Sequence, residues 1–410
     1  MIKVNKPKIR FNEFENIWTK SKLGELYEVY SGNTPSRSDS RNYQDGEIPW
    51  IKTTDLNNSI ISFNEEKISV YGATKLKVLP ENSVLIAMYG GFNQIGRTGL
   101  LAYPATINQA LVALMPVNRI NPNFLLNFLN FKKESWRNVA ASSRKDPNIT
   151  KNDVEKFIIS FPTLEEQSAI GSLFRTIDDL LASYKDNLAN YQSLKATMLS
   201  KMFPKAGQTV PEIRLDGFDG EWEIVKLGDN CRIITGGTPR TGVKEFWNPK
   251  EIPWMSSGEI NKKILNETEE MISYIGLENS SAKWVKQNSV LIALAGQGQT
   301  RGRVAINKIP LTTNQSIAAI ETNDNIDFLF LYTDLSRRYD ELRLISSGDG
   351  TRGGLNKTII SNLELNLPTL EEQQAIGAYF SNLDNLIATH QEKISQLETL
   401  KKKLLQDMFI

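Results

Sequence analysis

The chain has 410 residues, of which 40% are hydrophobic and 23% charged, and its 48 lysines and arginines nearly balance 47 aspartates and glutamates. This composition predicts a folded protein of two or three domains, and it excludes a strongly basic chain that would bind nucleic acid unaided through its charge. A single cysteine, Cys231, and a single histidine, His390, exclude an internal disulfide and a His/Cys metal cluster, and they fit a reducing cytoplasm.

The first predicted elements are a short arm over residues 1–17 and a globular unit over residues 18–162. Within this unit, strand-like runs such as Val84–Tyr89 (VLIAMY) alternate with glycine-rich turns, which predicts a mixed α/β fold. Its polar loops carry Arg, Asn and Gln, the side chains that make bidentate contacts with guanine or adenine. The candidate DNA-binding residues of this unit are Arg37, Arg41, Asn93, Gln94, Arg97, Arg144 and Lys145.

A long helix is expected next, over residues 163–204. Thr163 and Glu166 have the spacing of a capping box, which predicts that the helix begins there. Apolar residues then recur every seven positions, a spacing that requires a partner helix. The residues expected on this helix-pair surface, where partners would also dock, are Ile177, Leu181, Tyr184, Leu188 and Tyr191.

After a linker arm over residues 205–221, the chain repeats itself. The stretch from Pro162 (PTLEEQSAIG) returns at Pro368 (PTLEEQQAIG), and the arm pattern IRxxxFxxxW begins at both Ile9 and Ile213. A second globular unit is therefore expected over residues 222–368 and a second long helix over residues 369–410. The equivalent loop candidates are Arg240, Lys244, Gln297, Gln299, Arg301, Arg303, Arg352 and Lys357. The equivalent helix residues are Leu383, Ile387, Ile394 and Leu397.

The duplication predicts an α+β fold: two mixed α/β domains related by a pseudo-two-fold axis and separated by an antiparallel pair of long helices. Each arm should then lie beside the end of a long helix, the first arm at the distal helix and the second at the central one. His390 is expected on the helix seam opposite Tyr184, as an ordinary packed residue. The strand frames and helices of the two copies agree while their polar loops diverge, which is the pattern expected of a chain that recognises two unlike half-sites.

Taken together, the two PTLEEQ…IG…LD helices, the two IRxxxFxxxW…KLG introductions and the order of the repeats resemble the specificity subunit of type I restriction-modification systems. The resemblance covers essentially the whole chain. It implies that each globular unit is a target recognition domain reading one half of a bipartite site on double-stranded DNA. It also implies that the helices space the two halves and dock two methylation subunits, through which restriction subunits join.

The resemblance further implies a non-catalytic chain, with S-adenosylmethionine, ATP and Mg held only by partner subunits and no metal or cofactor in this one. Consistent with this, the sequence carries no Asn-Pro-Pro-Tyr or Asp-Pro-Pro-Tyr motif and no phosphate-binding Lys loop. Two alternatives stay open. One is the recognition subunit of a related system whose methylase and nuclease are fused in one partner, and the other is a coiled-coil adaptor that binds only proteins.

Overall fold

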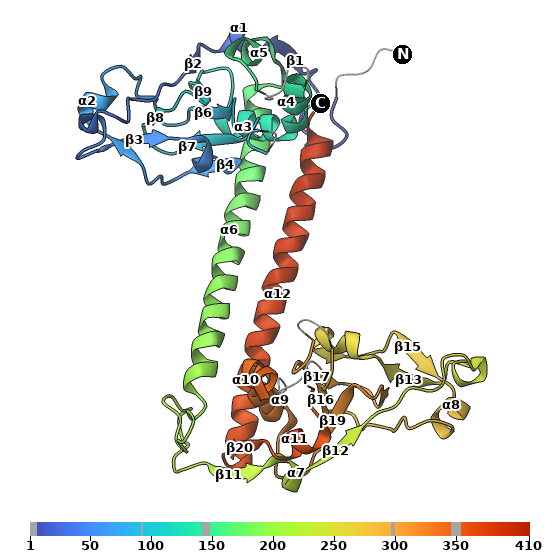
Figure 1. Cartoon of the computed structure of the whole chain (residues 1–410). Helices are drawn as coiled ribbons and strands as arrows, with labels where there is room; N and C mark the ends of the chain where they lie inside the picture. Colours follow the sequence, from blue (N-terminus) through green and yellow to red (C-terminus); the bar gives the residue numbers. More distant parts are fainter. Residues whose placement is uncertain (1–5, 92, 142–147, 297–299, 346–353) are drawn as a thin grey trace. The chain divides into compact units, whose positions relative to one another are not determined.

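The computed structural model describes residues 6–91, 93–141, 148–296, 300–345 and 354–410. The chain divides into two compact units: unit 1, Met1–Asp186 together with Gln391–Ile410, and unit 2, Asn187–His390. Each unit therefore combines one globular domain with a portion of both long helices (Figure 1). The rotation near 180° that the duplication predicts between the two domains stays a prediction.

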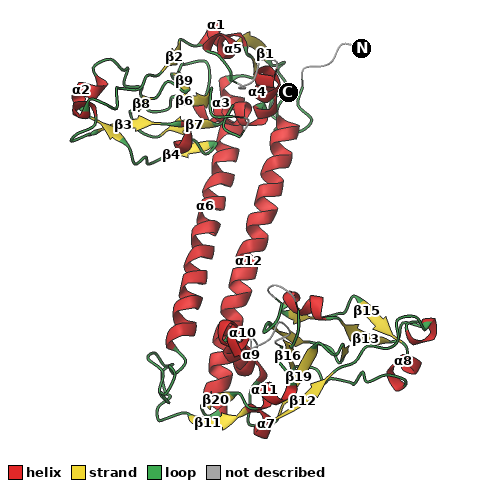
Figure 2. Cartoon of the chain, viewed as in Figure 1, coloured by secondary structure: helices red, strands yellow, loops and turns green. Residues whose placement is uncertain are grey.

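The first domain and the helix that follows it alternate short strands with short helices (Figure 2). Their elements are β1 (Thr19–Lys22), α1 (Leu23–Leu26), β2 (Val29–Ser31), η1 (Ser40–Asn42), β3 (Ile48–Ile51), η2 (Thr53–Asp55), β4 (Ser59–Ile61), β5 (Lys67–Ile68), α2 (Val70–Ala73), β6 (Val84–Ala87), β7 (Thr98–Leu101), β8 (Thr106–Ile107), β9 (Leu111–Leu114), α3 (Pro122–Phe131), α4 (Lys133–Ala141), α5 (Lys151–Lys156), β10 (Ile158–Phe161) and α6 (Leu164–Lys201).

The second domain repeats this series element for element. Its elements are β11 (Glu223–Lys226), α7 (Leu227–Asn230), β12 (Cys231–Thr235), η3 (Lys244–Phe246), β13 (Ile252–Met255), η4 (Ser257–Lys262), β14 (Ile264–Leu265), β15 (Glu270–Ile272), α8 (Tyr274–Glu278), β16 (Val290–Ala293), β17 (Val304–Asn307), β18 (Thr312–Thr313), β19 (Ile317–Thr322), α9 (Phe328–Arg337), α10 (Tyr339–Ile345), α11 (Lys357–Ser361), β20 (Glu364–Leu367) and α12 (Leu370–Met408).

Each domain is built on a five-stranded mixed sheet with the same strand order. In the first domain the order is β2-β9-β6-β7-β4, and in the second it is β12-β19-β16-β17-β14. The central strands β6 and β16 are the VLIA runs of the sequence, and every residue in them is buried, which is typical of a strand covered on both faces. Away from the long helices, each domain carries a smaller three-stranded sheet, β5-β3-β8 or β15-β13-β18 (Figure 1). We call these smaller sheets and their loops the tips.

The arms pack against the ends of the long helices, as the duplication predicts. The backbone N–H of Ile9 donates to the carbonyl of Asp407 within unit 1, and that of Ile213 donates to Lys201 within unit 2, both over 2.9 Å. Each arm also brings an arginine to the start of a long helix. Arg10 binds both carboxylate oxygens of Glu166, Nε to Oε1 and Nη2 to Oε2 at 2.7 Å each.

In unit 2 Arg214 binds Glu372 in the same way, at 2.7 and 2.6 Å. This corrects the expected capping box. Thr163 does accept the backbone N–H of Glu166 at the helix start, but the Glu166 carboxylate is fully buried and bound to the arm arginine instead of capping the helix.

Within each unit the two long helices run antiparallel. In unit 1, Asp178 pairs with Lys401 and Lys185 pairs with Glu398, so residue numbers rise along α6 as they fall along α12. In unit 2, Lys195 pairs with Asp384 over 2.6 Å. Ile177, Leu181 and Leu383 of the expected helix surface are buried, and the remaining expected residues are half-buried: Tyr184, Leu188, Tyr191, Ile387, Ile394 and Leu397.

The expected position of His390 opposite Tyr184 stays a prediction, because the two residues belong to different units. The imidazole ring of His390 lies 5.2 Å from the ring of Tyr191, two helical turns further along α6. The ion pair of Lys195 with Asp384, also in unit 2, fits the same register.

A phenylalanine just beyond the end of each long helix enters the core of a globular domain. In unit 1, Phe409 lies between 5.4 and 6.4 Å from the rings of Trp18, Phe124, Phe128, Phe131 and Phe174. In unit 2, Phe203 makes the same kind of contact with Trp222, Phe330 and Phe380. The domain of each copy is thus completed by the helix end of the other copy.

Candidate nucleic-acid interface

Ten of the expected DNA-binding side chains lie in the described residues, in two places on the first domain and three on the second. Arg37 and Arg41, like Arg240 and Lys244, belong to the tips. Asn93, Gln94 and Arg97, like Arg301 and Arg303, lie in the hairpin after the central strand, and Lys357 is exposed in α11. Outside the described residues lie Arg144, Lys145, Gln297, Gln299 and Arg352.

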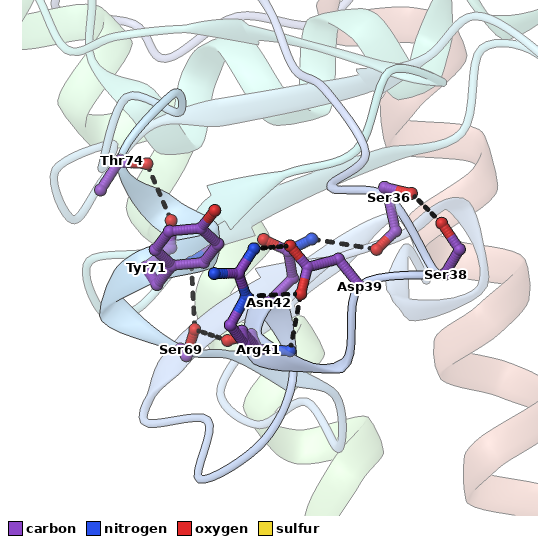
Figure 3. Close-up of polar contacts among 9 residues, drawn as sticks. Ser36, Ser38, Asp39, Arg41, Asn42, Ser69, Tyr71 and Thr74 are labelled. Atoms are coloured by element: carbon purple, nitrogen blue, oxygen red, sulfur yellow. Dashed lines mark hydrogen bonds and ion pairs between the residues drawn. The ribbon is translucent and has the colours of Figure 1, made fainter.

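The tip of the first domain holds a polar hollow of about 380 Å³. At its edge Arg41 donates two hydrogen bonds to Asp39, of 2.9 and 2.8 Å, and its guanidinium lies 4.7 Å from the centre of the Tyr71 ring. This hydrogen-bonded pairing with Arg41 lowers the pKa of the Asp39 carboxyl. Figure 3 shows these side chains together with Asn42, Ser69 and Thr74.

Arg37 belongs to the same tip and has other partners. Its guanidinium stacks 4.3 Å over the Tyr43 ring and forms an ion pair with Glu66, which also binds Lys52. Burial opposes the ionised form of Glu66, but the two cations outweigh it and lower the pKa of its carboxyl. Two cations beside the rings of Tyr43 and Trp50 are suited to recognise a planar or anionic group.

The tip of the second domain has the same frame and different chemistry. Ser69 donates to the backbone carbonyl of Arg41, and Ser273 donates to the backbone carbonyl of Glu245, both over 2.5 Å. Glu245 of the second tip is therefore at the position that Arg41 has in the first tip. A carboxylate replaces a guanidinium there.

The hairpin loops after the central strands, in contrast, place an arginine at the same position in both domains. Gly96 and Gly302 have φ values of 72° and 82°, a left-handed conformation that favours glycine. The N–H of each glycine donates to the central strand, at Ala87 or Ala293, over 3.0 and 2.9 Å. The residue after each glycine is an arginine, Arg97 or Arg303.

Arg301 differs from these two. It occupies the place of Ile95, which is completely buried in the first domain, and Arg301 itself is only half-exposed. Its burial indicates that part of this side chain packs within the loop.

Each of the matched arginines meets a second basic residue from the helix behind it. In unit 2 the guanidinium groups of Arg303 and Arg343 lie 5.7 and 5.6 Å from the centre of the same ring, that of Tyr339. Lys133 takes the place of Tyr339 in unit 1. Burial lowers the pKa of the Lys133 ammonium, and the positive charges of Arg137 and Arg97 lower it further.

Each unit has a groove between its domain and a long helix, with both long helices lining it in unit 1 and α6 alone in unit 2. The groove of unit 1, about 500 Å³, is lined by Asn57, Asn58, Ser59, Asn130, Lys133, Asp178, Leu181, Ala182, Lys185, Glu398, Lys401, Lys402 and Leu405. The groove of unit 2, about 310 Å³, is lined by Lys195, Leu199, Ile260, Asn261, Lys263, Gly302, Arg303, Val304, Tyr332, Ser336 and Tyr339. Basic side chains outnumber acidic ones on both linings.

The sequence matches the family described as type I restriction modification DNA specificity domain twice, over residues 15–190 and 219–399. The chain belongs to this family. It is 23% identical to the type I restriction enzyme MjaVIII specificity subunit of Methanocaldococcus jannaschii, over 95% of this chain and 91% of that protein. It is 27% identical to the EcoR124I/EcoR124II specificity subunit of Escherichia coli, over 45% of this chain and 46% of that one.

Among solved structures, the S subunit of a type I restriction-modification system from M. genitalium has a similar fold. The TM-score is 0.65 at 16% sequence identity, and the likeness covers 99% of both chains. The two globular domains are thus the two DNA specificity domains of a recognition subunit, and α6 and α12 are the long helices that pack together.

Two features, a metal-binding group and a membrane-spanning helix, are absent from the described residues. No group of three or more His, Cys, Asp or Glu side chains there is placed to hold a metal ion. Nor does any helix in those ranges combine the length and the apolar character that crossing a membrane requires. At the helix starts, the carboxylates of Glu166 and Glu372 are bound by Arg10 and Arg214.

Sequence reasoning missed Arg137 and Arg343 as members of the candidate interface. Both lie inside helices, where the sequence pattern of a single arginine indicates only a solvated surface residue. The repeat itself would have indicated them, since they are separated by the same 206 residues as Arg97 and Arg303.

Proposed function

We propose that each specificity domain of this recognition subunit reads one half of a bipartite DNA target. The observation that carries this proposal is the contrast within the matched tips, where one backbone frame presents Arg41 in the first domain and Glu245 in the second. Arginine donates to guanine and a carboxylate accepts from cytosine, so the two tips are suited to different base pairs.

The long helices are proposed to dock two methylation subunits. The seam between the helices uses the heptad residues, so a docking partner needs other apolar side chains. Leu180 and Leu400 in unit 1 are 43% and 45% exposed, and they lie level with one another in the register set by the ion pairs. Leu386 and Leu194 repeat this arrangement in unit 2, which favours the same partner bound twice.

In this proposal the chain has no catalytic role and binds no cofactor. S-adenosylmethionine, ATP and Mg are used by the partner subunits, and restriction subunits join through the methylation subunits. The complex acts in the cytoplasm, where its DNA target lies. The charge of the chain is close to neutral overall, so strong specific binding to DNA depends on the partners as well.

Methylation profiling tests the proposal directly. DNA from cells that produce this chain with its methylation subunit should carry methylated adenine or cytosine in a bipartite motif. Replacing residues 222–368 by the equivalent domain of a relative should change one half of that motif and keep the other. A change in both halves, or in neither, would contradict the assignment of one half-site to each domain. Absence of any sequence-specific methylation would favour a protein-only adaptor.

A further inference from the structure

Because the two domains have the same fold, equivalent positions can be compared between them. Some of these positions carry different residues in the two domains, and others carry the same residue. The tips vary: Arg41 stands where the second domain has Glu245. The hairpin loops keep an arginine, Arg97 and Arg303, in the same backbone setting. A side chain that occurs identically in both domains cannot by itself distinguish two unlike half-sites, so it is suited to a group that both half-sites share. The phosphate backbone is such a group.

The setting of each arginine is suited to an anion. In unit 2, Arg303 and Arg343 lie on the same aromatic ring, that of Tyr339. The hydroxyl of this tyrosine also accepts a hydrogen bond of 3.3 Å from Arg343 Nη1, which helps to fix that guanidinium. Both guanidinium groups lie near one ring, and each carries a fork of N–H donors that suits phosphate oxygens.

In unit 1 the equivalent positions bring three cations together: Arg97, Lys133 and Arg137. Burial lowers the pKa of the Lys133 ammonium, and the charges of Arg137 and Arg97 lower it further, whereas Glu134 raises it. Glu134 forms an ion pair with Arg137 over 2.8 Å, and its side chain is 74% exposed. Gathering like charges at a partly buried place is costly in the free chain, and a bound anion relieves that cost.

Resting on the proposed function, we propose that Arg97 with Arg137, and Arg303 with Arg343, are paired phosphate clamps that hold the DNA backbone at equivalent points of the two half-sites. They supply affinity and register to both recognition domains without contributing to base choice. The lysine-lined groove beside each clamp extends the positive surface along which the backbone lies. Base choice then falls to the side chains that differ between the domains.

The experiment uses the full chain assembled with its methylation subunit and the target found by methylation profiling. Arg97→Ala and Arg303→Ala are compared with wild type on the target duplex and on duplexes changed at each base pair of either half-site. Affinities are measured by fluorescence anisotropy at salt concentrations from about 50 to about 200 mM. Arg232→Ala is the matched control, because Arg232 is an exposed arginine at a place that Glu28 holds in the first domain.

Each clamp variant should bind every duplex about tenfold more weakly than wild type, with the ratio between matched and changed duplexes kept within about twofold. The slope of log affinity against log salt should fall in magnitude by about 0.9 for each phosphate that the variant no longer neutralises. Arg97→Lys and Arg303→Lys should recover part of the affinity, because a lysine still attracts phosphate as a point charge. The control should bind within about twofold of wild type, with an unchanged salt slope.

Relaxed preference at particular base pairs of one half-site, with an unchanged salt slope, would show a base contact and overturn the clamp assignment. Unchanged DNA binding, or loss of the methylation subunit from the complex on a sizing column, would also overturn it. Each variant is first checked by thermal unfolding, and Arg→Lys stands in for Arg→Ala where the latter does not fold. Failure of the wild-type complex to bind any bipartite duplex would instead contradict the proposed function itself.

Discussion

Replacing Arg10 by alanine should destabilise unit 1 by several kcal/mol. Its side chain is 12% exposed and makes two bonds of 2.7 Å to Glu166, whose carboxylate is fully buried. Without Arg10 this carboxylate stays buried and uncompensated, a change that costs about 3–5 kcal/mol in buried ion pairs. The bond of 2.6 Å from Arg10 to the carbonyl of Asn16 is removed as well, and this adds about 1 kcal/mol.

Urea unfolding followed by circular dichroism measures the total loss of stability, and hydrogen exchange locates it. With a slope of about 2 kcal/mol per molar urea, a destabilisation of about 4 kcal/mol lowers the midpoint of the affected transition by about 2 M. Faster exchange should appear in the first arm and the start of α6 for Arg10→Ala. For Arg214→Ala it should appear in the second arm and the start of α12, because Arg214 and Glu372 repeat the arrangement.

Lys8→Ala is the control within the same arm. The Lys8 side chain is 80% exposed and pairs with Asp407 over 3.3 Å, so its removal should cost less than about 1 kcal/mol. The double variant Arg10→Met/Glu166→Leu removes both charges and should recover most of the stability. If Arg10→Ala costs no more than Lys8→Ala, or if the double variant is as unstable as the single one, the reasoning from buried charge is wrong.

Three further predictions concern other parts of the chain. Leu180→Ser and Leu400→Ser should each weaken binding of a methylation subunit by roughly tenfold or more, because burying a leucine contributes about 1.5–3 kcal/mol. Titration calorimetry checks this. Unaltered affinity would rule out a docking surface that includes Leu180 and Leu400. Burial raises the pKa of Cys231 to about 12, so near neutral pH its thiol is almost entirely protonated. It should react with iodoacetamide at least about tenfold more slowly than free cysteine until pH rises or the chain unfolds, and prompt alkylation of the native protein, read by mass spectrometry, would contradict this. Adding excess S-adenosylmethionine to the isolated chain should leave its thermal unfolding temperature within about 1 °C, whereas a clear rise would show a cofactor site in this chain.

The parts of the fold that could be predicted from sequence are those encoded by local periodicity and by repetition. The two long helices, their antiparallel course and the contact of each arm with a helix end all follow from those two signals. The side-chain role of Glu166 could not be predicted, because a carboxylate three residues after Thr163 has the same spacing whether it caps the helix or binds an arginine. Only folding reveals that Arg10, 156 residues away, reaches it.

The register of the helix pair could also not be predicted from the heptad spacing of apolar residues. Heptad spacing places an apolar residue opposite His390 in either of two alignments, with Tyr184 or with Tyr191. Charged pairs such as Lys195–Asp384 add information that the apolar spacing lacks, and within unit 2 they accompany a contact of His390 with Tyr191. The DNA contacts are harder to predict from the sequence, because polar loops have no periodicity. An arginine in a loop gives the same sequence pattern whether its side chain packs against the protein, as that of Arg301 partly does, or faces a ligand.

The position of Phe409 has a consequence for how the protein is made. The core of unit 1 contains this residue, yet a ribosome reaches it only after it has synthesised all of unit 2. At roughly 5–20 residues per second, the first domain waits on the order of 10–40 s with its aromatic pocket open. Unit 2, Asn187–His390, is continuous along the chain and encounters no such delay. During translation, the domain that is synthesised first is therefore the one whose core is completed last. In that interval its exposed apolar residues are a binding site for a chaperone.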